Sequence, residues 1–290
     1  AQGHFVYDSK KSGSTTVSYL RFGPRPIRST YRIGRAQLVA IHDPEFLDRR
    51  DVLATAMPGA IVLLNTSVPA ERVWDSLPVE AQAVLCERRC RLYAIDAYGL
   101  AEKAGLERRI NTVMQVCFFA LAKVLPEEEA LAHIKRSIEQ TWGKRGPEVV
   151  RRNLVALDAA KDGLRVIEVP AVPTTSRKRL PVVAPGAPDF VQRVTRLLLE
   201  GNGDLLPVSA FPPDGTWPTG TSKFEKRAIA SDIPIWQPDI CVQCNFCSMI
   251  CPHSAILTKV YDPSHLDHAP EGFRSLPEAF EPAFEGQRYT

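Results

Sequence analysis

Hydrophobic residues in the first part of the chain form short strand-like runs separated by stretches of helical periodicity. The runs are rich in β-branched and aromatic residues, as strands are, and lie at residues 4–7, 16–22, 37–41, 60–65 and 91–95. The fourth run, AIVLLN, is apolar without alternation, which predicts a strand buried on both faces. Residues 1–168 are therefore expected to form an α/β domain with a mostly parallel sheet and flanking helices.

Three helices are predicted in the later part of this domain. Apolar residues keep helical spacing over residues 110–124, which places Cys117 on the core face as a small buried hydrophobe. A second helix opens at Pro126, where three successive glutamates suit the positive end of the helix dipole. A third helix is expected from Pro147 to about residue 160.

The composition changes after residue 168. The stretch VPAVPTTSRKRLPVVAPGAPD at 169–189 predicts an extended linker that wraps or leaves the first domain, and its basic residues are interpreted as a solvated surface. A short helix completes this segment, 169–200. Residues 201–232 have breakers every few positions and predict a small connecting domain, and residues 233–290 form a last domain.

Composition excludes several classes of protein. Of the 290 residues, 44% are hydrophobic and 24% charged, as in a soluble globular protein, and the net charge of +3 gives no argument for nucleic acid or membrane. No apolar run approaches the ~20 residues of a membrane span, and no signal peptide is evident. We expect a cytoplasmic protein. The chain begins with Ala1, and we expect it to be a fragment of a longer one.

Four of the seven cysteines lie close together, at Cys241, Cys244, Cys247 and Cys251, and Pro252 follows the last. The spacing C-x2-C-x2-C-x3-C-P is that of bacterial ferredoxins, in which three thiolates bind one [4Fe–4S] cluster and the fourth binds a neighbouring cluster. A structural zinc site is the alternative, although it more often uses two paired C-x2-C units separated by a longer loop.

A two-cluster domain needs a second motif, and no cysteine follows Cys251. We expect that motif to lie beyond a truncated chain. The alternative is a site with one cluster, in which Cys251 occupies the fourth corner.

Several longer blocks resemble pyruvate:ferredoxin (flavodoxin) oxidoreductases, in the same order and over nearly the whole chain. These blocks are VYDSKKSGS at 6–14, LRFGPRPIRSTY at 20–31, RRINTVMQ at 108–115, LPVSAF at 206–211, GTSKFEKR at 220–227 and CVQCNFCSMICPHSAIL at 241–257. The resemblance implies an internal fragment of a large enzyme. It implies a γ-like domain, a connecting domain and the first part of a ferredoxin-like domain.

The same resemblance implies an activity. The family converts pyruvate and coenzyme A to acetyl-CoA and CO2, and passes electrons through [4Fe–4S] clusters to ferredoxin or flavodoxin. It implies that thiamine diphosphate is bound by domains outside this chain, that the complete enzyme is a homodimer, and that nitrogenase can be the final electron user. No catalytic residue is assigned. The alternative function is a ferredoxin-like electron carrier fused to an α/β module, or a zinc-stabilised interaction module.

The γ-like domain of the family is implicated in coenzyme A binding, which draws attention to residues 9–13. Lys10, Lys11, Ser12 and Gly13 form a possible phosphate-binding turn, because glycine permits close approach and ammonium groups balance phosphate charge. An ordinary solvated turn is the alternative. Asn111 opens the predicted helix 110–124, either as an N-cap or as a contact of an anionic ligand. The resemblance favours a place for the turn near coenzyme A, and for Asn111 near coenzyme A or the reacting centre.

Overall fold

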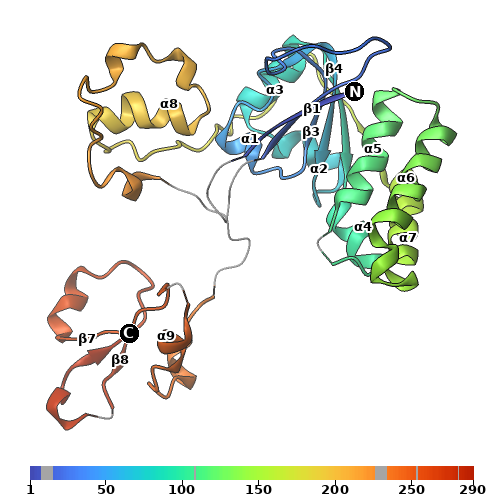
Figure 1. The fold of residues 1–290 in the computed structure, drawn as a ribbon. Coiled ribbons are helices and arrows are strands. Elements are labelled where there is room, and N and C mark those ends of the chain that lie inside the picture. Colours follow the sequence, from blue (N-terminus) through green and yellow to red (C-terminus); the bar gives the residue numbers. More distant parts are fainter. Residues whose placement is uncertain (8–15, 108, 226–233, 253, 280) are drawn as a thin grey trace. The chain divides into compact units, whose positions relative to one another are not determined.

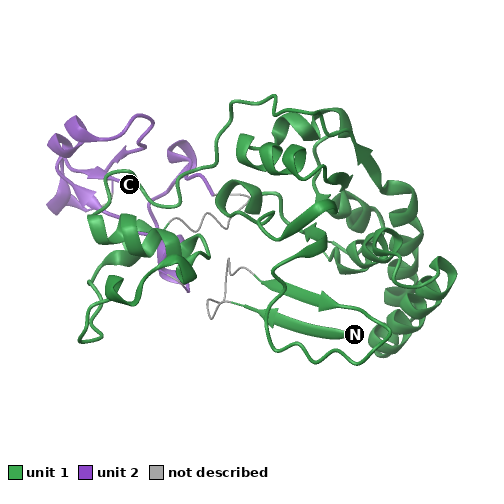
Figure 2. Ribbon diagram, turned by 90° about the horizontal axis from the view of Figure 1, so that it is seen from above, with its two compact units in different colours: residues 1–227 green, residues 228–290 purple. Residues whose placement is uncertain are grey.

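The chain divides into two units, Ala1–Arg227 (unit 1) and Ala228–Thr290 (unit 2), shown in different colours in Figure 2. The computed structural model describes residues 1–7, 16–107, 109–225, 234–252, 254–279 and 281–290. Each unit is described by itself.

The central sheet of unit 1 has the strand order β3-β4-β5-β6 (Figure 1). Its strands are β3 (Ala36–Ile41), β4 (Ala56–Asn65), β5 (Arg91–Ile95) and β6 (Arg165–Ile167). Strands β3, β4 and β5 run parallel to one another, and β6 is antiparallel to β5. The prediction of a mostly parallel sheet is confirmed.

Two of the predicted strands lie outside this sheet. They are β1 (Gln2–Val6) and β2 (Val17–Arg21), which pair with each other in an antiparallel ladder. The connection between them, residues 7–16, is shorter than the dozen or so residues that a parallel crossover requires. Their short separation therefore favours an antiparallel pair over membership of the parallel sheet.

Helices cover both faces of the central sheet (Figure 1). They are α1 (Phe46–Arg49), α2 (Ala70–Ser76), α3 (Val79–Glu87), α4 (Ala97–Lys103), α5 (Asn111–Ala122), α6 (Glu127–Trp142) and α7 (Pro147–Gly163). Val62 and Leu64 of β4 belong to a core that includes α1–α3, whereas Leu63 belongs to a second core that includes α4–α7. Residues 60–65 are all buried, which confirms the prediction of a strand covered on both faces.

The three predicted helices are confirmed with small shifts at their ends. Helix α5 places Cys117 in the second core, where its side chain is 1% exposed. Helix α6 begins at Glu127 directly after Pro126, and α7 has Pro147 in its first turn. These boundaries follow the expected roles of proline and acidic residues at helix N-termini.

Hydrogen bonds hold the Pro-rich segment after β6 against the rest of unit 1, and its basic residues take part. The Arg179 guanidinium donates to the Leu47 carbonyl at 3.0 Å, and the Arg177 guanidinium contacts Asp48 at 2.6 Å. The Val79 amide donates to the Arg177 carbonyl at 2.7 Å. Arg177 and Lys178 are exposed, as the sequence predicted, and the two arginines in addition fasten the segment to α1 and α3.

The remainder of unit 1 is mostly irregular, as predicted for residues after 200. A helical stretch comprises η2 (Val191–Thr195) and α8 (Arg196–Leu199), which confirms the predicted short helix. Three short turns follow, η3 (Gly203–Leu205), η4 (Val208–Ala210) and η5 (Thr221–Phe224), and η1 (Gly143–Arg145) lies earlier, between α6 and α7. Val183, Ala187 and Val191 form a small third core here, against which Phe224 packs.

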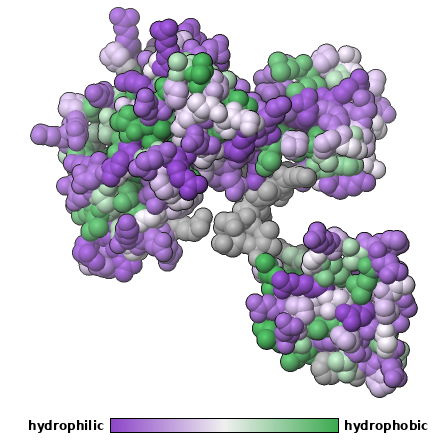
Figure 3. Space-filling model, turned by 180° about the vertical axis from the view of Figure 1, so that it is seen from behind, coloured by the Kyte–Doolittle hydropathy of each residue, from purple (hydrophilic) through white to green (hydrophobic). Residues whose placement is uncertain are grey.

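Unit 2 has little regular structure and almost no core. It contains η6 (Pro238–Ile240), α9 (Phe246–Ile250), η7 (Pro263–His268), η8 (Pro282–Phe284) and a sheet of β7 (Val260–Tyr261), β9 (Arg288–Tyr289) and β8 (Leu276–Pro277) in that order. Of the described residues in unit 2, Tyr289 alone is a buried hydrophobic residue. Apolar side chains lie instead at its surface (Figure 3), Val242, Phe246 and Met249 among them.

Candidate metal centre

The four clustered cysteines lie on a loop and a short helix of unit 2. Cys241 follows η6, Cys244 lies between two residues in the left-handed conformation, Cys247 is in α9, and Cys251 ends that helix. The two left-handed residues are Gln243 (φ 52°) and Asn245 (φ 57°). Asn tolerates this conformation better than most residues, whereas Gln does so at a steric cost. The loop therefore turns sharply on both sides of Cys244.

Backbone amides point at two of the cysteine sulfurs. The Gln243 N–H donates to Cys241 Sγ at 3.4 Å, and the Ala255 N–H donates to Cys251 Sγ at 3.3 Å. Hydrogen bonds of this kind favour the charged thiolate, and they set the reduction potential of a cluster bound through the sulfur. Cys241 and Cys251 are half-buried, whereas Cys244 and Cys247 are exposed.

Tyr289 of strand β9 contacts the cysteine loop and is influenced by the charge of its thiols. Burial raises the pKa of the Tyr289 phenol, and negative charge on Cys241, Cys247 and Cys244 raises that pKa further, while a hydrogen bond with the Thr258 side chain opposes the shift. The Tyr289 hydroxyl donates to Asn245 Oδ1 at 2.8 Å. The phenol therefore ties strand β9 to the residue that follows Cys244 in the motif.

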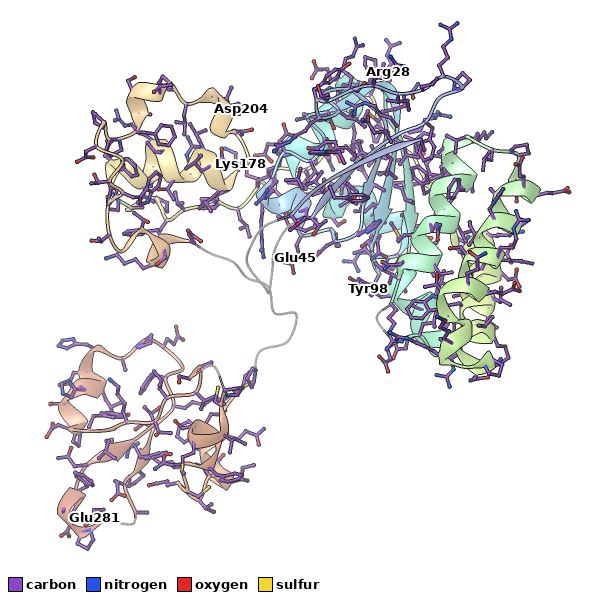
Figure 4. All side chains as sticks on the ribbon, viewed as in Figure 1. Arg28, Glu45, Tyr98, Lys178, Asp204 and Glu281 are labelled. Atoms are coloured by element: carbon purple, nitrogen blue, oxygen red, sulfur yellow. The ribbon has the colours of Figure 1, made fainter. Side chains whose placement is uncertain are left out.

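An open cavity of about 440 Å³ lies between the cysteine loop and the small sheet. Residues 242–245 line one side, and Val260, Glu278, Glu281, Phe284 and Tyr289 line the other; Glu281 is labelled in Figure 4. Among the described residues, no three His, Cys, Asp or Glu side chains are placed so that they could hold a metal ion. The assignment of a bound group therefore rests on the chemistry of the donors.

That chemistry fits an iron–sulfur cluster. The donors are four free thiols, their spacing is that of a ferredoxin motif, and backbone amides already approach two sulfurs. Cys241, Cys244, Cys247 and Cys251 are the residues that would hold the cluster or clusters.

The other three cysteines belong to unit 1 and show no such arrangement. Cys90 and Cys117 are buried and Cys86 is half-buried. Burial raises the pKa of the Cys117 thiol to about 12, and the thiol faces the Ala160 carbonyl of α7 at 4.0 Å. The prediction that Cys117 is a small buried core residue is confirmed.

The residues predicted to contact coenzyme A are only partly described. Lys10, Lys11, Ser12 and Gly13 lie outside the described residues. Asn111 is exposed at the first position of α5, and Ile110 occupies the N-cap position without a side-chain capping bond.

The end of α5 that carries Asn111 is anchored to a neighbouring helix. The adjacent Thr112 hydroxyl is buried and bonds to Asn153 Oδ1 of α7 at 2.7 Å. Asn111 is thus held at the exposed N-terminus of a firmly packed helix.

Sequence reasoning missed the residues that support the cysteine loop. Asn245 carries a weak signal, since Asn tolerates the left-handed conformation of a sharp turn, whereas Gln243 carries none. Tyr289 carries none, because it lies far along the chain from the motif and reaches it only through the sheet.

The comparisons with known proteins divide the chain in three. The family model for pyruvate ferredoxin/flavodoxin oxidoreductase matches residues 1–163, a domain of unknown function matches residues 176–230, and the 4Fe–4S binding domain matches residues 234–257. An α/β domain and a 4Fe–4S binding domain on one chain define an iron–sulfur protein. The chain belongs to the pyruvate ferredoxin/flavodoxin oxidoreductase family.

Curated relatives share this organisation over the whole chain. The pyruvate-flavodoxin oxidoreductase of Nostoc sp. is 49% identical over an aligned length of 297 residues, which covers 100% of this chain and 25% of the relative. The probable pyruvate-flavodoxin oxidoreductase of Escherichia coli is 47% identical over 290 residues, again 100% of this chain and 25% of the relative. The chain therefore spans about a quarter of the length of the curated relatives it matches.

A solved structure resembles part of the chain distantly. It is the crystal structure of the pyruvate oxidoreductase subunit PORC from Thermotoga maritima, with a TM-score of 0.44, 19% identity, and coverage of 58% of this chain and 81% of that one. Within the part of the chain that the structure describes, no helix combines the length and apolar character needed to cross a membrane.

Proposed function

We propose that this chain is part of an enzyme that oxidatively decarboxylates pyruvate with coenzyme A, yielding acetyl-CoA and CO2, and that delivers the electrons to ferredoxin or flavodoxin. One observation carries the proposal: this chain matches both the oxidoreductase family model and the 4Fe–4S binding domain, and it is similar over its whole length to relatives named pyruvate-flavodoxin oxidoreductase. The activity belongs to the complete enzyme, of which these residues contribute the relay of electrons and a part of the substrate site.

In unit 2, the proposal assigns Cys241, Cys244 and Cys247 to one [4Fe–4S] cluster and Cys251 to a neighbouring one. A bound cluster would supply reversible one-electron redox chemistry. The protein contributes the thiolates and the amide groups of Gln243 and Ala255, which donate to sulfur. These donors favour negative charge on the sulfurs and so help to set the reduction potential.

In unit 1, the proposal assigns Lys10, Lys11, Ser12 and Gly13 to the phosphates of coenzyme A, with Asn111 near the same ligand. The support is the chemistry of the residues: two ammonium groups, a hydroxyl and a glycine suit a phosphate, and Asn111 is exposed at a helix N-terminus.

The remaining parts of the proposal concern the complete enzyme. Thiamine diphosphate is bound by domains other than those described here, the enzyme is a homodimer, and it works in the cytoplasm. Reducing power for nitrogenase is one use of its electrons. These statements extend from the family to which the chain belongs.

The test is a pair of cysteine variants in the full-length protein. Cys244→Ser removes a proposed ligand, and Cys86→Ser makes the same change in unit 1. We expect Cys244→Ser to lower the iron content and abolish flavodoxin reduction that depends on pyruvate and coenzyme A, whereas Cys86→Ser retains both. Equal iron and equal flavodoxin reduction in the two variants would contradict the proposal.

A further inference from the structure

The loop around Cys244 holds a conformation that needs support from outside. Gln243 and Asn245, on either side of Cys244, both have positive φ, 52° and 57°. Residues other than glycine adopt this conformation rarely, and it persists only where the surroundings fix it. Gln243 and Asn245 are not among the cysteines that would bind the cluster. A contact that supports them therefore acts on the conformation of the loop and not directly on the metal.

That support comes from the strands that follow the motif. The Gln243 side chain donates to the Pro277 carbonyl at 2.7 Å and accepts from the Ala279 N–H at 3.3 Å. The Tyr289 hydroxyl donates to Asn245 Oδ1 at 2.8 Å. Each left-handed residue is thereby tied to the small sheet by its own side chain.

Tyr289 is itself the buried residue of this sheet. It lies in β9, between β7 and β8, and is 5% exposed. Its neighbour Thr290 exchanges two backbone hydrogen bonds with Lys259, at 2.9 and 3.0 Å. Its ring lies 6.2 Å from that of Trp236, which precedes the motif. The position of its hydroxyl is therefore set by the sheet and not by the loop.

We propose that Tyr289 is a positioning residue for the iron–sulfur site: its hydroxyl holds Asn245 in the left-handed conformation and so fixes where Cys244 and Cys247 present their sulfurs. The inference rests on the proposed binding of a cluster by these cysteines. Without the hydroxyl, the loop samples more conformations, and the thiolates depart more often from the corners that a cluster offers.

The chain provides a matched control for the loss of this hydroxyl. Tyr289→Phe removes it and keeps the ring. Tyr261→Phe makes the same change on β7 of the same sheet, where the hydroxyl bonds to Ser275 Oγ at 2.6 Å. Asn245→Gly removes the acceptor and keeps access to the left-handed conformation. The double variant of Tyr289 and Asn245 tests whether the two residues act through one contact.

Two properties of the full-length protein are measured after anaerobic reconstitution. The first is the rate at which the cluster absorption disappears in the presence of an iron chelator. The second is the electron paramagnetic resonance of the reduced protein, in which the relevant signal is the one lost in Cys244→Ser. The second measurement reports the cluster environment, which a general loss of stability does not change. Circular dichroism checks that each variant folds.

We expect Tyr289→Phe and Asn245→Gly each to lose the cluster about three- to tenfold faster than the wild type, which is about 0.6–1.4 kcal/mol at 1.4 kcal/mol per tenfold. The double variant should be no faster than the quicker single variant, and the resonance signal should broaden or shift in all three. Tyr261→Phe should match the wild type in both measurements.

Two results would overturn the inference and leave the proposed function intact. In the first, the wild type holds its cluster and Tyr289→Phe behaves like Tyr261→Phe. In the second, the double variant loses its cluster faster by the product of the two single-variant effects, so that Tyr289 and Asn245 act independently. A wild type that takes up no iron at all overturns the proposed function, and the inference with it.

Discussion

The two units each use a glutamine to fasten a later segment of chain to an earlier one, but in opposite surroundings. In unit 1, Gln82 donates to the Trp74 carbonyl at 2.8 Å and accepts from the Thr174 and Thr175 amides at 2.8 and 3.1 Å. In unit 2, Gln243 bridges Pro277 and Ala279 in the same manner. Gln82 is fully buried, whereas Gln243 is half-buried.

The difference lies in what surrounds each glutamine. Gln82 is on α3, in a unit with two large hydrophobic cores, one on each face of the sheet. In unit 2, only Tyr289 is a buried hydrophobic residue among those described. A domain that buries so little apolar surface gains little from the hydrophobic effect, and small domains of this kind commonly depend on a metal for their stability. Unit 1 is thus stabilised by its core, whereas unit 2, if the proposed function holds, depends on the cluster assigned to its cysteines.

Removal of iron should break this comparison most clearly. When the full-length protein is stripped of iron by a chelator, we expect unit 2 to lose its structure and unit 1 to keep it, because the proposed function places the metal in unit 2 and metal binding is coupled to folding. Hydrogen exchange measures both units in one experiment. Amides of β9 should lose protection completely, while amides of β4 keep theirs.

The control for this experiment is Cys86→Ser, whose iron content and β9 protection should equal those of the wild type. Persistent protection of β9 without iron would show that the polar contacts of Gln243 and Tyr289 suffice to fold unit 2. It would contradict the view that unit 2 depends on a metal whereas unit 1 does not.

The same contrast explains how much of the fold the sequence could predict. In unit 1, the period of the hydrophobic residues carries the information, so β4, β5, α5 and α7 appear near their predicted positions. In unit 2, periodicity is absent, and the cysteine spacing alone points to the site. That spacing identifies the expected cluster ligands, but it does not identify the residues that fix the conformation of the loop carrying them.

The missed features are all contacts between distant segments. The Pro-rich segment carries a basic run that looks solvated in the sequence, yet Arg179 bonds to the Leu47 carbonyl and the Arg179 amide donates to Glu80. Tyr289 likewise reaches Asn245 across the sheet. Neither pairing has a local signature, since each depends on how the chain returns upon itself.

Substitution of Gln82 or Gln243 tests the same comparison between the units, with a smaller expected effect than the removal of iron. Gln82→Leu leaves the Trp74 carbonyl and two backbone amides without their partner in a buried site, which should cost about 1–3 kcal/mol. The free energy of opening, measured by hydrogen exchange of β4 amides, reports this loss. Gln243→Leu should leave β4 unchanged and increase the exchange of β8 and β9 amides instead.

The exposed Gln115 of α5 is the control for both glutamine variants. Gln115→Leu should change the opening free energy by no more than about 0.5 kcal/mol, as surface substitutions usually do. A cost for Gln82→Leu within the same range would show that the Pro-rich segment does not depend on Gln82.

The smallest effect concerns pH and the buried thiol of unit 1. Burial holds the pKa of Cys117 at about 12, against an ordinary value of 9.0. Below pH 9 the thiol is protonated in both folded and unfolded chains, so its contribution to stability is complete. As pH rises from 9 towards 12, only the unfolded chain ionises at Cys117, and stability should fall by up to about 1.4 kcal/mol per pH unit.

A variant at position 117 isolates this effect. Cys86 and Cys90, whose pKa values are also raised by burial, are present in both the variant and the wild type and contribute equally to the pH dependence of the two proteins. The opening free energy of β4 amides should therefore fall less steeply between pH 9 and 10 in Cys117→Ala than in the wild type, by up to about 1.4 kcal/mol. Parallel pH profiles would mean that Cys117 ionises as readily in the folded core as in the open chain. In that case water would reach the second core of unit 1 at α5. The contrast between unit 1, stabilised by a core that excludes water, and the metal-dependent unit 2 would then be contradicted.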